Sequence, residues 1–253
     1  MPTQQKIGHV TLIGCGPGDA ELLTIKALRA IEGAECVLYD NLVGEGVLGF
    51  LPASAERVYV GKQSSRHTLP QEEIIALMIK IAKEGKNLLR LKGGDGYIFG
   101  RGGEEAEGLK AAGVPFSVIP GISAVQGAAA NFKIPLTFRD CARALTLVTG
   151  HLSMDRKLYL DWDMLARRDA TIAVYMGIGT IEIICRELLA HGLAENTPAA
   201  IIERATLPDE RLLFSPLKNL PENAHAAGFA PPSLILVGEA LRHHCADNFL
   251  GGF

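Results

Sequence analysis

Short apolar runs rich in β-branched residues alternate with longer amphipathic stretches along the chain. Five such runs in the first half have the length and composition of buried strands: residues 10–13, 36–39, 57–60, 87–91 and 116–119. Residues 20–31 and 71–83 carry apolar side chains at helical spacing, and Asp19 is suited to cap the first of these helices. The alternation predicts βα units around a mostly parallel sheet.

The same pattern restarts beyond Pro135. Five further runs are strand candidates: residues 145–149, 171–175, 199–203, 211–214 and 234–237. A helix is predicted over 181–190, while PLTFRDCA at 135–142 carries a proline and few periodic positions, which is typical of a hinge. We therefore predict two α/β domains with mostly parallel sheets, residues 1–136 and 137–253.

Composition and charge limit the class of protein. Apolar residues make up 48% of 253 residues, enough for large buried cores, and the formal net charge is -3. No overall positive field exists to hold nucleic acid or an anionic membrane. The N-terminus has no signal-like apolar stretch, and no run approaches the ~18 apolar residues that a membrane span needs. The sequence predicts a soluble, cytoplasmic protein with neither a nucleic-acid nor a membrane partner.

The five cysteines form no CxxC pair and are scattered, which suits a reducing compartment. We interpret most of them as small buried apolar residues. His243, His244 and Cys245 are adjacent, but a metal site needs three or four suitably spaced ligands and no second cluster is present. The sequence therefore predicts no metal.

Glycine is concentrated in three segments, 14–18, 93–103 and 121–127, where clustered glycines indicate close approach of the backbone to another group. The first, GCGPGD, lies between a predicted strand and helix, as a dinucleotide-binding loop does. Asp40 occupies the place of a ribose-binding acid, which makes an NAD-dependent oxidoreductase one candidate.

Two residues of the first loop weaken that interpretation. Asp19 replaces the third glycine of the fingerprint, and Pro17 removes an N–H from a turn whose donors should face pyrophosphate. A nucleotide-fold enzyme without pyrophosphate is an equal alternative at this point. The second loop, RLKGGDGYIFGRGGEE at 90–105, is too specific for a linker, and a dehydrogenase does not explain it.

Seven motifs follow one another along the chain: GCGPGD, YDNLV, RLKGGDGYIFGRGGEE, VIPGISA, IPLTFRD, LVTGH and VYMG. In this order and spacing they resemble the tetrapyrrole methylase family over nearly the whole length, most closely its uroporphyrinogen-III C-methyltransferases. The resemblance implies two α/β domains with S-adenosylmethionine bound in the cleft between them. The cofactor-binding residues that it implies are Pro17, Gly93, Gly94, Asp95, Ile98, Ser123, Ala124, Met176 and Ala205.

Glycine and other small residues suit such a cofactor, because its sulfonium, amino acid end and adenine need backbone groups at close range. Met176, taken without the resemblance, would be interpreted as a core methionine at a strand end. The implied substrate is uroporphyrinogen III, methylated twice through precorrin-1 to precorrin-2 with release of S-adenosylhomocysteine. It is a polycarboxylate, so cations should gather at its site. The candidate cations are Lys62, Arg66, His67, Arg101, Arg139 and Arg143.

The resemblance also implies individual roles. Arg101, Glu104 and Arg139 match positions associated with substrate binding and catalysis, while Asp40 and Lys62 match a proton acceptor and a proton donor. A carboxylate such as Asp40 is a physically easy base. Arg101 is a difficult one because the pKa of a guanidinium lies above about 12, so we expect it to orient substrate carboxylates.

The sequence departs from the usual family pattern in four places: Gly96 for proline, Phe138 for histidine, Ala205 for glycine, and Glu210 near a usual glutamine. Gly96 loosens its loop, and Phe138 puts in question any role of that histidine. None of the four removes a charge assigned above.

Other functions stay open beside the principal one. They are a sister precorrin methyltransferase, a more distant relative that methylates ribosomal RNA or a protein side chain, and a non-catalytic sensor of an adenine-containing ligand. The run from RLKGGD to GRGGEE argues against the distant relatives, and the presence of all the residues with an implied role in substrate binding or proton transfer argues against a sensor. The first strand begins near residue 9, so we expect no fused dehydrogenase and chelatase module before it. The resemblance implies a homodimer, and the pathway that uses the product is not visible in the residues.

Overall fold

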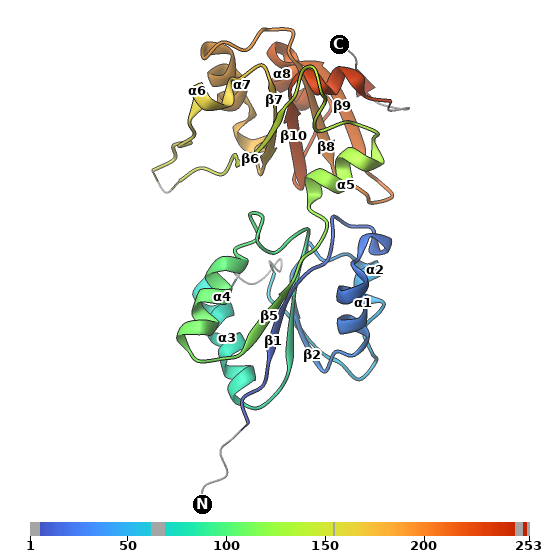
Figure 1. The fold of residues 1–253 in the computed structure, drawn as a ribbon, viewed down its shortest axis with the longest axis vertical. Helices are drawn as coiled ribbons and strands as arrows, with labels where there is room; N and C mark the ends of the chain where they lie inside the picture. Colours follow the sequence, from blue (N-terminus) through green and yellow to red (C-terminus); the bar gives the residue numbers. More distant parts are fainter. Residues whose placement is uncertain (1–5, 62–68, 154, 246–249, 252–253) are drawn as a thin grey trace, which may run out of the picture. The chain divides into compact units, whose positions relative to one another are not determined.

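A computed structural model describes residues 6–61, 69–153, 155–245 and 250–251 (Figure 1). The chain folds into two compact units, Met1–Ala124 and Val125–Phe253. Each unit has its own sheet with apolar cores on both faces. Each is a mixed helix and sheet structure, as predicted.

The division falls earlier than the predicted boundary after residue 136. Helix α5 (Ala124–Asn131) begins at the division and belongs to the second unit. Val125 and Ala128 of this helix are buried in one cluster with Phe214. The apolar face of α5 therefore assigns the segment to the C-terminal sheet, although the proline-containing hinge motif follows it.

The sheet of the N-terminal unit has the order β3-β2-β4-β1-β5, and all its strand pairs are parallel. Its strands are β1 Val10–Gly14, β2 Cys36–Tyr39, β3 Glu56–Tyr59, β4 Leu88–Lys92 and β5 Phe116–Ile119. Each predicted strand of this unit is confirmed to within one residue at either end. Because the strands are parallel, the loops that follow them all leave from the same edge of the sheet.

Helices cover both faces of this sheet (Figure 1). They are the 3-10 helix η1 Ala20–Leu22, α1 Ile25–Glu32, α2 Glu45–Leu48, α3 Gln71–Lys83 and α4 Gly102–Ala111. Helices α1 and α2 pack on one face, and α3 and α4 pack on the other. The helix predicted over 71–83 is confirmed.

The single helix predicted over 20–31 is wrong, because η1 and α1 are separate. Asp19 caps only η1, accepting the N–H of Glu21. Thr24 is extended and its hydroxyl accepts the N–H of Ala27, which starts α1 afresh.

The sheet of the C-terminal unit has the order β11-β9-β8-β10-β7-β6. Its strands are β6 Ala144–Thr149, β7 Ala170–Tyr175, β8 Pro198–Glu203, β9 Arg211–Pro216, β10 Ser233–Val237 and β11 Leu250–Gly251. The prediction of a mostly parallel sheet is wrong here, because only β6–β7 and β9–β11 are parallel pairs. Strand β8 is antiparallel to β9 and β10, and β10 is antiparallel to β7.

One short connection causes the mixed pairing. Residues 204–210 join β8 to β9 without a helix, and a short connection of this kind reverses the chain. Helix α8 (Leu220–Ala226) then carries the chain from β9 to β10, which therefore also runs opposite to β8. Sequence alternation does not show this reversal, because parallel and antiparallel strands buried on both faces have the same apolar pattern.

The helices of the C-terminal unit also lie on both faces of its sheet. They are α5, α6 Trp162–Leu165, η2 Ile178–Thr180, α7 Ile181–Ala190, η3 Leu217–Asn219, α8 Leu220–Ala226 and η4 Glu239–His243. Helices α6, α7 and α8 pack on one face, while α5 and η4 pack on the other. Within the described residues, no helix has the length and apolar character needed to cross a bilayer.

The cysteines follow the sequence prediction for the most part. Cys15, Cys36 and Cys185 are buried, whereas Cys141 is half-buried and Cys245 is exposed. Burial raises the pKa of Cys15 and of Cys185 to about 12. These two thiols are therefore almost wholly protonated near neutral pH.

Iodoacetamide at pH 8 is expected to alkylate Cys245 at least about 100-fold faster than Cys15 or Cys185, because only the thiolate reacts and the buried thiols are neutral and shielded. Peptide mass spectrometry over a time course measures the three rates. In denaturant the rates should converge. Equal rates in the folded protein would contradict the burial of these thiols.

Candidate functional site

The three glycine segments meet at the carboxyl ends of β1, β4 and β5. Gly16 and Gly94 form an antiparallel bridge, in which the N–H of Gly16 donates to the carbonyl of Gly94 at 3.1 Å and the N–H of Gly94 donates back at 2.6 Å. Gly121 packs against both segments: a Cβ there would lie 2.6 Å from the carbonyl carbon of Gly14 and closer still to the oxygen of Gly94. This is the edge at which open parallel sheets bind ligands.

Gly121→Ala is expected to lower the free energy of unfolding by about 1–3 kcal/mol, because the added methyl has to displace backbone rather than a side chain. Gly103→Ala is the matched control: a Cβ at this exposed position of α4 would meet nothing within 4 Å. It should leave stability unchanged or raise it by up to about 1 kcal/mol. Urea unfolding measures both, and equal stabilities would contradict the close packing.

Asp95 holds the second and third glycine segments together. Its Oδ1 accepts the N–H of Tyr97 at 2.8 Å, and its Oδ2 accepts the N–H of Gly121 at 3.0 Å. Gly93 packs against the segment after β2, where a Cβ would lie 2.7 Å from the Cβ of Leu42. The backbone cradle is therefore built from loops that are far apart in the sequence.

The other predicted cofactor residues of the N-terminal unit line the same loops. Pro17, Gly94, Ile98 and Ala124 are half-buried, and Ser123 is buried. Gly94 has a φ of +65°, and a Cβ there would meet only the N of Ala124, at 3.7 Å. Backbone is thus accessible beside Gly94, as a ligand that needs main-chain donors and acceptors requires.

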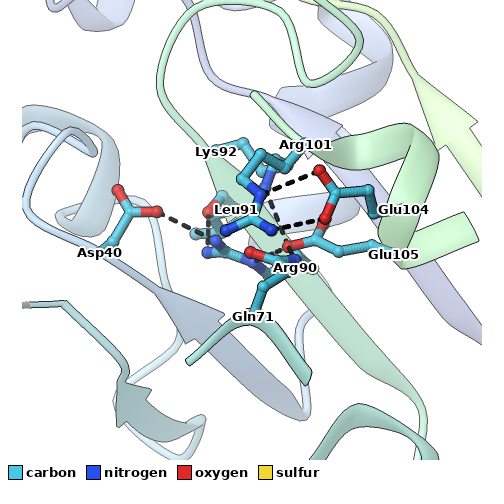
Figure 2. A network of polar contacts seen from close by, with 8 residues as sticks. All are labelled: Asp40, Gln71, Arg90, Leu91, Lys92, Arg101, Glu104 and Glu105. Carbon is cyan, nitrogen blue, oxygen red and sulfur yellow. Dashed lines mark hydrogen bonds and ion pairs between the residues drawn. The ribbon is translucent and has the colours of Figure 1, made fainter. Parts of the chain in front are cut away.

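A buried charge cluster lies beside this cradle (Figure 2). Arg90 and Lys92 of β4 are only 3% and 4% exposed. Glu105 of α4 accepts Arg90 Nε at 3.1 Å and Lys92 Nζ at 2.9 Å, and Arg90 Nη2 also bonds Asp40 Oδ2 at 3.0 Å. Gln71 Nε2 donates to the same Glu105 oxygen at 3.2 Å. We call Asp40, Gln71, Arg90, Lys92 and Glu105 the buried charge cluster.

Burial and the charge of Arg90 lower the pKa of Lys92. Sequence reasoning missed Arg90, Lys92 and Glu105 as site residues. A signal was present, because two cations alternate with leucine in a strand that is otherwise apolar, LLRLK. Charged residues at such positions need buried partners.

Asp40 is held at both oxygens. Its Oδ1 accepts the N–H of Leu42 at 3.0 Å, while Oδ2 is bonded by Arg90. Its side chain is 23% exposed. The carboxylate is therefore fixed in orientation and still reachable from solvent, as the predicted proton acceptor has to be.

Arg101 has a left-handed backbone, with φ at 59°, and so does Phe99, with φ at 52°. Non-glycine residues in this conformation often mark functional loops. Glu104 accepts Arg101 Nε at 2.9 Å and Nη2 at 2.6 Å (Figure 2), and the guanidinium is more than half exposed. The hydrogen bond raises the pKa of Arg101 and lowers that of Glu104. Arg101 therefore loses its proton even less readily, which agrees with an orienting role.

Electrostatic effects link these residues. The charge of Lys92 lowers the pKa of Glu104, after the larger effect of Arg101, and the charge of Asp40 acts on Lys92. Figure 2 shows Asp40 and the Arg101–Glu104 pair around Arg90 and Glu105. The structure thus brings together three predicted site residues of the N-terminal unit. Lys62, the predicted proton donor, lies outside the described residues, as do Arg66 and His67.

In the C-terminal unit Met176 follows β7 with φ at 54° and is 50% exposed, so its interpretation as a core methionine is wrong. The loops after β6 and β7 are in close contact, since a Cβ on Gly150 would lie 2.5 Å from the Cα of Gly177. The hydroxyl of Thr180 donates to the carbonyl of Gly150 at 2.8 Å. Rigid backbone therefore presents the Met176 side chain to solvent.

Arg139 lies in a turn that is closed by two backbone hydrogen bonds between Phe138 and Ala142, at 3.0 and 2.8 Å. Its side chain is exposed and has no ion-pair partner in the part of the chain that the structure describes. A free guanidinium of this kind is available to a carboxylate. Arg143 is also exposed and lies directly before β6.

Ala205 is half-buried between Arg204 and Thr206, whose φ values are 53° and 66°. Glu210 accepts the N–H of Thr206 at 2.8 Å and also bonds the side-chain amide of Asn131. Glu210, one of the departures from the family pattern, therefore ties this loop to α5.

The histidines near the C-terminus pack against aromatic rings. His243 stacks on Phe138 with ring centroids 3.6 Å apart, and His244 stacks on Phe214 at 4.1 Å. Burial lowers the pKa of His244. Over the described residues no group of three His, Cys, Asp or Glu is arranged to hold a metal ion. Phe138, which stands where histidine is usual, thus acts here as a stacking partner.

Comparison with known proteins places these features in a family. The sequence profile of the Tetrapyrrole (Corrin/Porphyrin) Methylases matches residues 9–221. A siroheme synthase of Nitrosospira multiformis is 51% identical over 237 residues, which are 94% of this chain and 50% of that protein. A siroheme synthase of Gluconacetobacter diazotrophicus is 50% identical, with similar coverage. The chain spans about half the length of the curated relatives it matches.

Solved structures agree with the sequence matches. Uroporphyrin-III C-methyltransferase from Thermus thermophilus, complexed with S-adenosylhomocysteine, is 40% identical with a TM-score of 0.78, covering 93% of this chain and 99% of that one. A cobalt precorrin-4 methyltransferase is 28% identical with a TM-score of 0.81, covering 92% and 95%.

Proposed function

Because the chain belongs to the tetrapyrrole (corrin/porphyrin) methylases, we propose that it is an S-adenosylmethionine-dependent C-methyltransferase that converts uroporphyrinogen III, through precorrin-1, to precorrin-2. The observation that carries the proposal is the glycine cradle with Asp40 and Arg101 at the same edge of the parallel sheet. The similar protein from Thermus thermophilus that was solved with S-adenosylhomocysteine supports it.

The cradle fits the proposed cofactor. Close packing at Gly14, Gly93 and Gly121 leaves no room for side chains, and the backbone beside Gly94 stays accessible. Main-chain N–H and C=O groups can then bind the polar ends of the cofactor. Met176 and Ala205 of the C-terminal unit belong to the same proposed set, and the exposed Met176 side chain is available for contact.

The cofactor supplies an electrophilic methyl group on its sulfonium. When bound, it would give that methyl to a pyrrole carbon: a C–C bond would form, the C–S bond would break, and the electron pair would stay on sulfur, which would leave S-adenosylhomocysteine. One proton then leaves the methylated macrocycle, and Asp40 is the proposed acceptor. Holding carbon and methyl in line contributes up to about 7–11 kcal/mol in favourable cases.

The chain's cations orient the substrate in this proposal. Arg101 and Arg139 are exposed, and each guanidinium can bind a carboxylate through two parallel hydrogen bonds. Glu104 holds Arg101 in place until a substrate carboxylate shares the guanidinium. Lys62 as proton donor, and a homodimeric assembly, remain predictions from the resemblance.

Incubation with S-adenosylmethionine and uroporphyrinogen III tests the proposal by mass spectrometry. We expect a product with one added methyl group, then a product with two, and one S-adenosylhomocysteine for each methyl. Activity only on a later precorrin would favour a sister methyltransferase, to which the cobalt precorrin-4 methyltransferase likeness points. Bound NAD released on denaturation would instead restore the oxidoreductase alternative.

A further inference from the structure

Glu105 is the centre of the buried charge cluster, and no substrate or cofactor role is assigned to it above. Its side chain is 0% exposed, and one of its oxygens, Oε1, accepts three donors: Gln71 Nε2, Arg90 Nε and Lys92 Nζ. The other oxygen, Oε2, is buried and has no hydrogen-bond partner within the described part of the chain. Such a centre ties several elements together through one carboxylate.

A buried ion cluster of this kind contributes little to the stability of the folded state. Removing two cations and two carboxylates from water costs free energy that their attraction repays only with complete hydrogen bonding. Here one carboxylate oxygen lacks a partner. Buried polar groups that are incompletely satisfied need an explanation, and their position beside the glycine cradle points to function.

The connections lead from Glu105 to Asp40. Arg90 donates from Nε to Glu105 and from Nη2 to Asp40, and Nη1 donates to the carbonyl of Leu91 at 2.8 Å. All three bonds fix the plane of one guanidinium, so Glu105 and the carbonyl of Leu91 together set the direction of its Nη2. The hydrogen bond from Nη2 then fixes the position of Asp40 Oδ2, and the N–H of Leu42 donates to Oδ1.

We propose that Glu105 is a positioning residue that, through Arg90, holds the Asp40 carboxylate in the orientation in which it accepts a proton from the methylated macrocycle. The inference rests on the proposed function for the role of Asp40. The geometric part, that Glu105 fixes Asp40, can be measured without any turnover. Glu105 touches neither substrate nor cofactor in this proposal.

Glu105→Gln tests the kinetic part, because it removes the charge and keeps the shape. We expect kcat for methyl transfer to fall by about 10-fold to 100-fold and KM for uroporphyrinogen III to change by less than about threefold. In an Asp40→Asn background the same substitution should have little further effect, because the group on which it acts is gone. An equal fold-loss in both backgrounds would overturn the proposal.

Hydrogen exchange of the Leu42 amide tests the geometric part, since this N–H is bonded to Asp40. We expect exchange in Glu105→Gln to be about 10-fold faster than in wild type, with amides of the C-terminal unit unchanged. An exchange rate at Leu42 in Glu105→Gln that equals the wild-type rate would overturn the proposal. If wild type fails to methylate uroporphyrinogen III, the proposed function is wrong, and the exchange still decides whether Glu105 holds Asp40.

Arg90→Lys is the second variant, in case Glu105→Gln does not fold. It keeps the positive charge, but a single ammonium cannot bridge two carboxylates as the guanidinium fork does. The same loss of kcat and the same faster exchange are expected. Glu56→Gln is the matched control, since it removes a half-exposed carboxylate that is paired with Lys86 in the same unit. It should behave as wild type. Failure of both test variants to fold would assign the cluster to stability alone and overturn the proposal.

Discussion

Asp40→Asn is expected to lower kcat for methyl transfer by about 100-fold to 10,000-fold, the range for loss of a general base. Asparagine has nearly the same shape, and its carbonyl oxygen can still accept the N–H of Leu42. It has no basic oxygen to take the proton from the macrocycle. Stopped assays with both substrates saturating measure the change, and calorimetric titration with S-adenosylhomocysteine should give an affinity within about twofold of wild type.

The control for this substitution is Asp163→Asn, which removes an exposed carboxylate of α6 in the C-terminal unit. It should leave kcat unchanged within experimental error. If Asp40→Asn retains turnover within about threefold of wild type, another group handles the proton, and the role of Asp40 is wrong even when the methylation reaction itself is observed.

Arg101→Lys is expected to raise KM for uroporphyrinogen III by about 10-fold to 100-fold, with a smaller change in kcat. A bidentate guanidinium–carboxylate pair is replaced by a single point charge, and hydrogen bonds to charged groups contribute about 1.5–3 kcal/mol each. The left-handed backbone at Arg101 is the same for both side chains, so the loop itself should be unchanged. Initial rates over a range of substrate concentrations separate KM from kcat.

Arg29→Lys is the comparison for Arg101→Lys, because Arg29 is an exposed arginine in the last turn of α1. It should leave both constants unchanged. The contrary result would be unchanged substrate binding in Arg101→Lys with turnover abolished, which would make Arg101 a participant in the chemistry rather than a group that orients carboxylates.

The period of apolar positions was sufficient to predict most of the elements. All five strands of the first sheet and the helices at α3 and α7 have the predicted bounds, within a residue for the strands. The relative direction of the strands in the second sheet was not predictable, because the reversal of the chain after β8 depends on a short connection. The boundary between the units depended on which sheet buries Val125 and Ala128, and this is a tertiary choice that local periodicity does not contain.

The candidate site was predicted unevenly. Motif resemblance indicated Asp40, Arg101 and Glu104, and the structure brings them around one cluster. The resemblance did not indicate Glu105, which lies beside Glu104 in the same pair of glutamates. Only the fold shows that the side chain of Glu104 is exposed and that of Glu105 is buried. Two neighbouring residues of a helix face different directions, and their partners decide their roles.

The order of the first sheet has a consequence during synthesis of the protein. Strand β1 is made first, but both of its neighbours, β4 and β5, lie far downstream in the chain. At about 5–20 residues per second, the ribosome needs roughly 5 to 20 seconds to extend the chain from Val10 to Ile119. For that time the nascent VTLIG segment lacks at least one of its two neighbouring strands, and an apolar strand left unpaired is a target for chaperones and for aggregation.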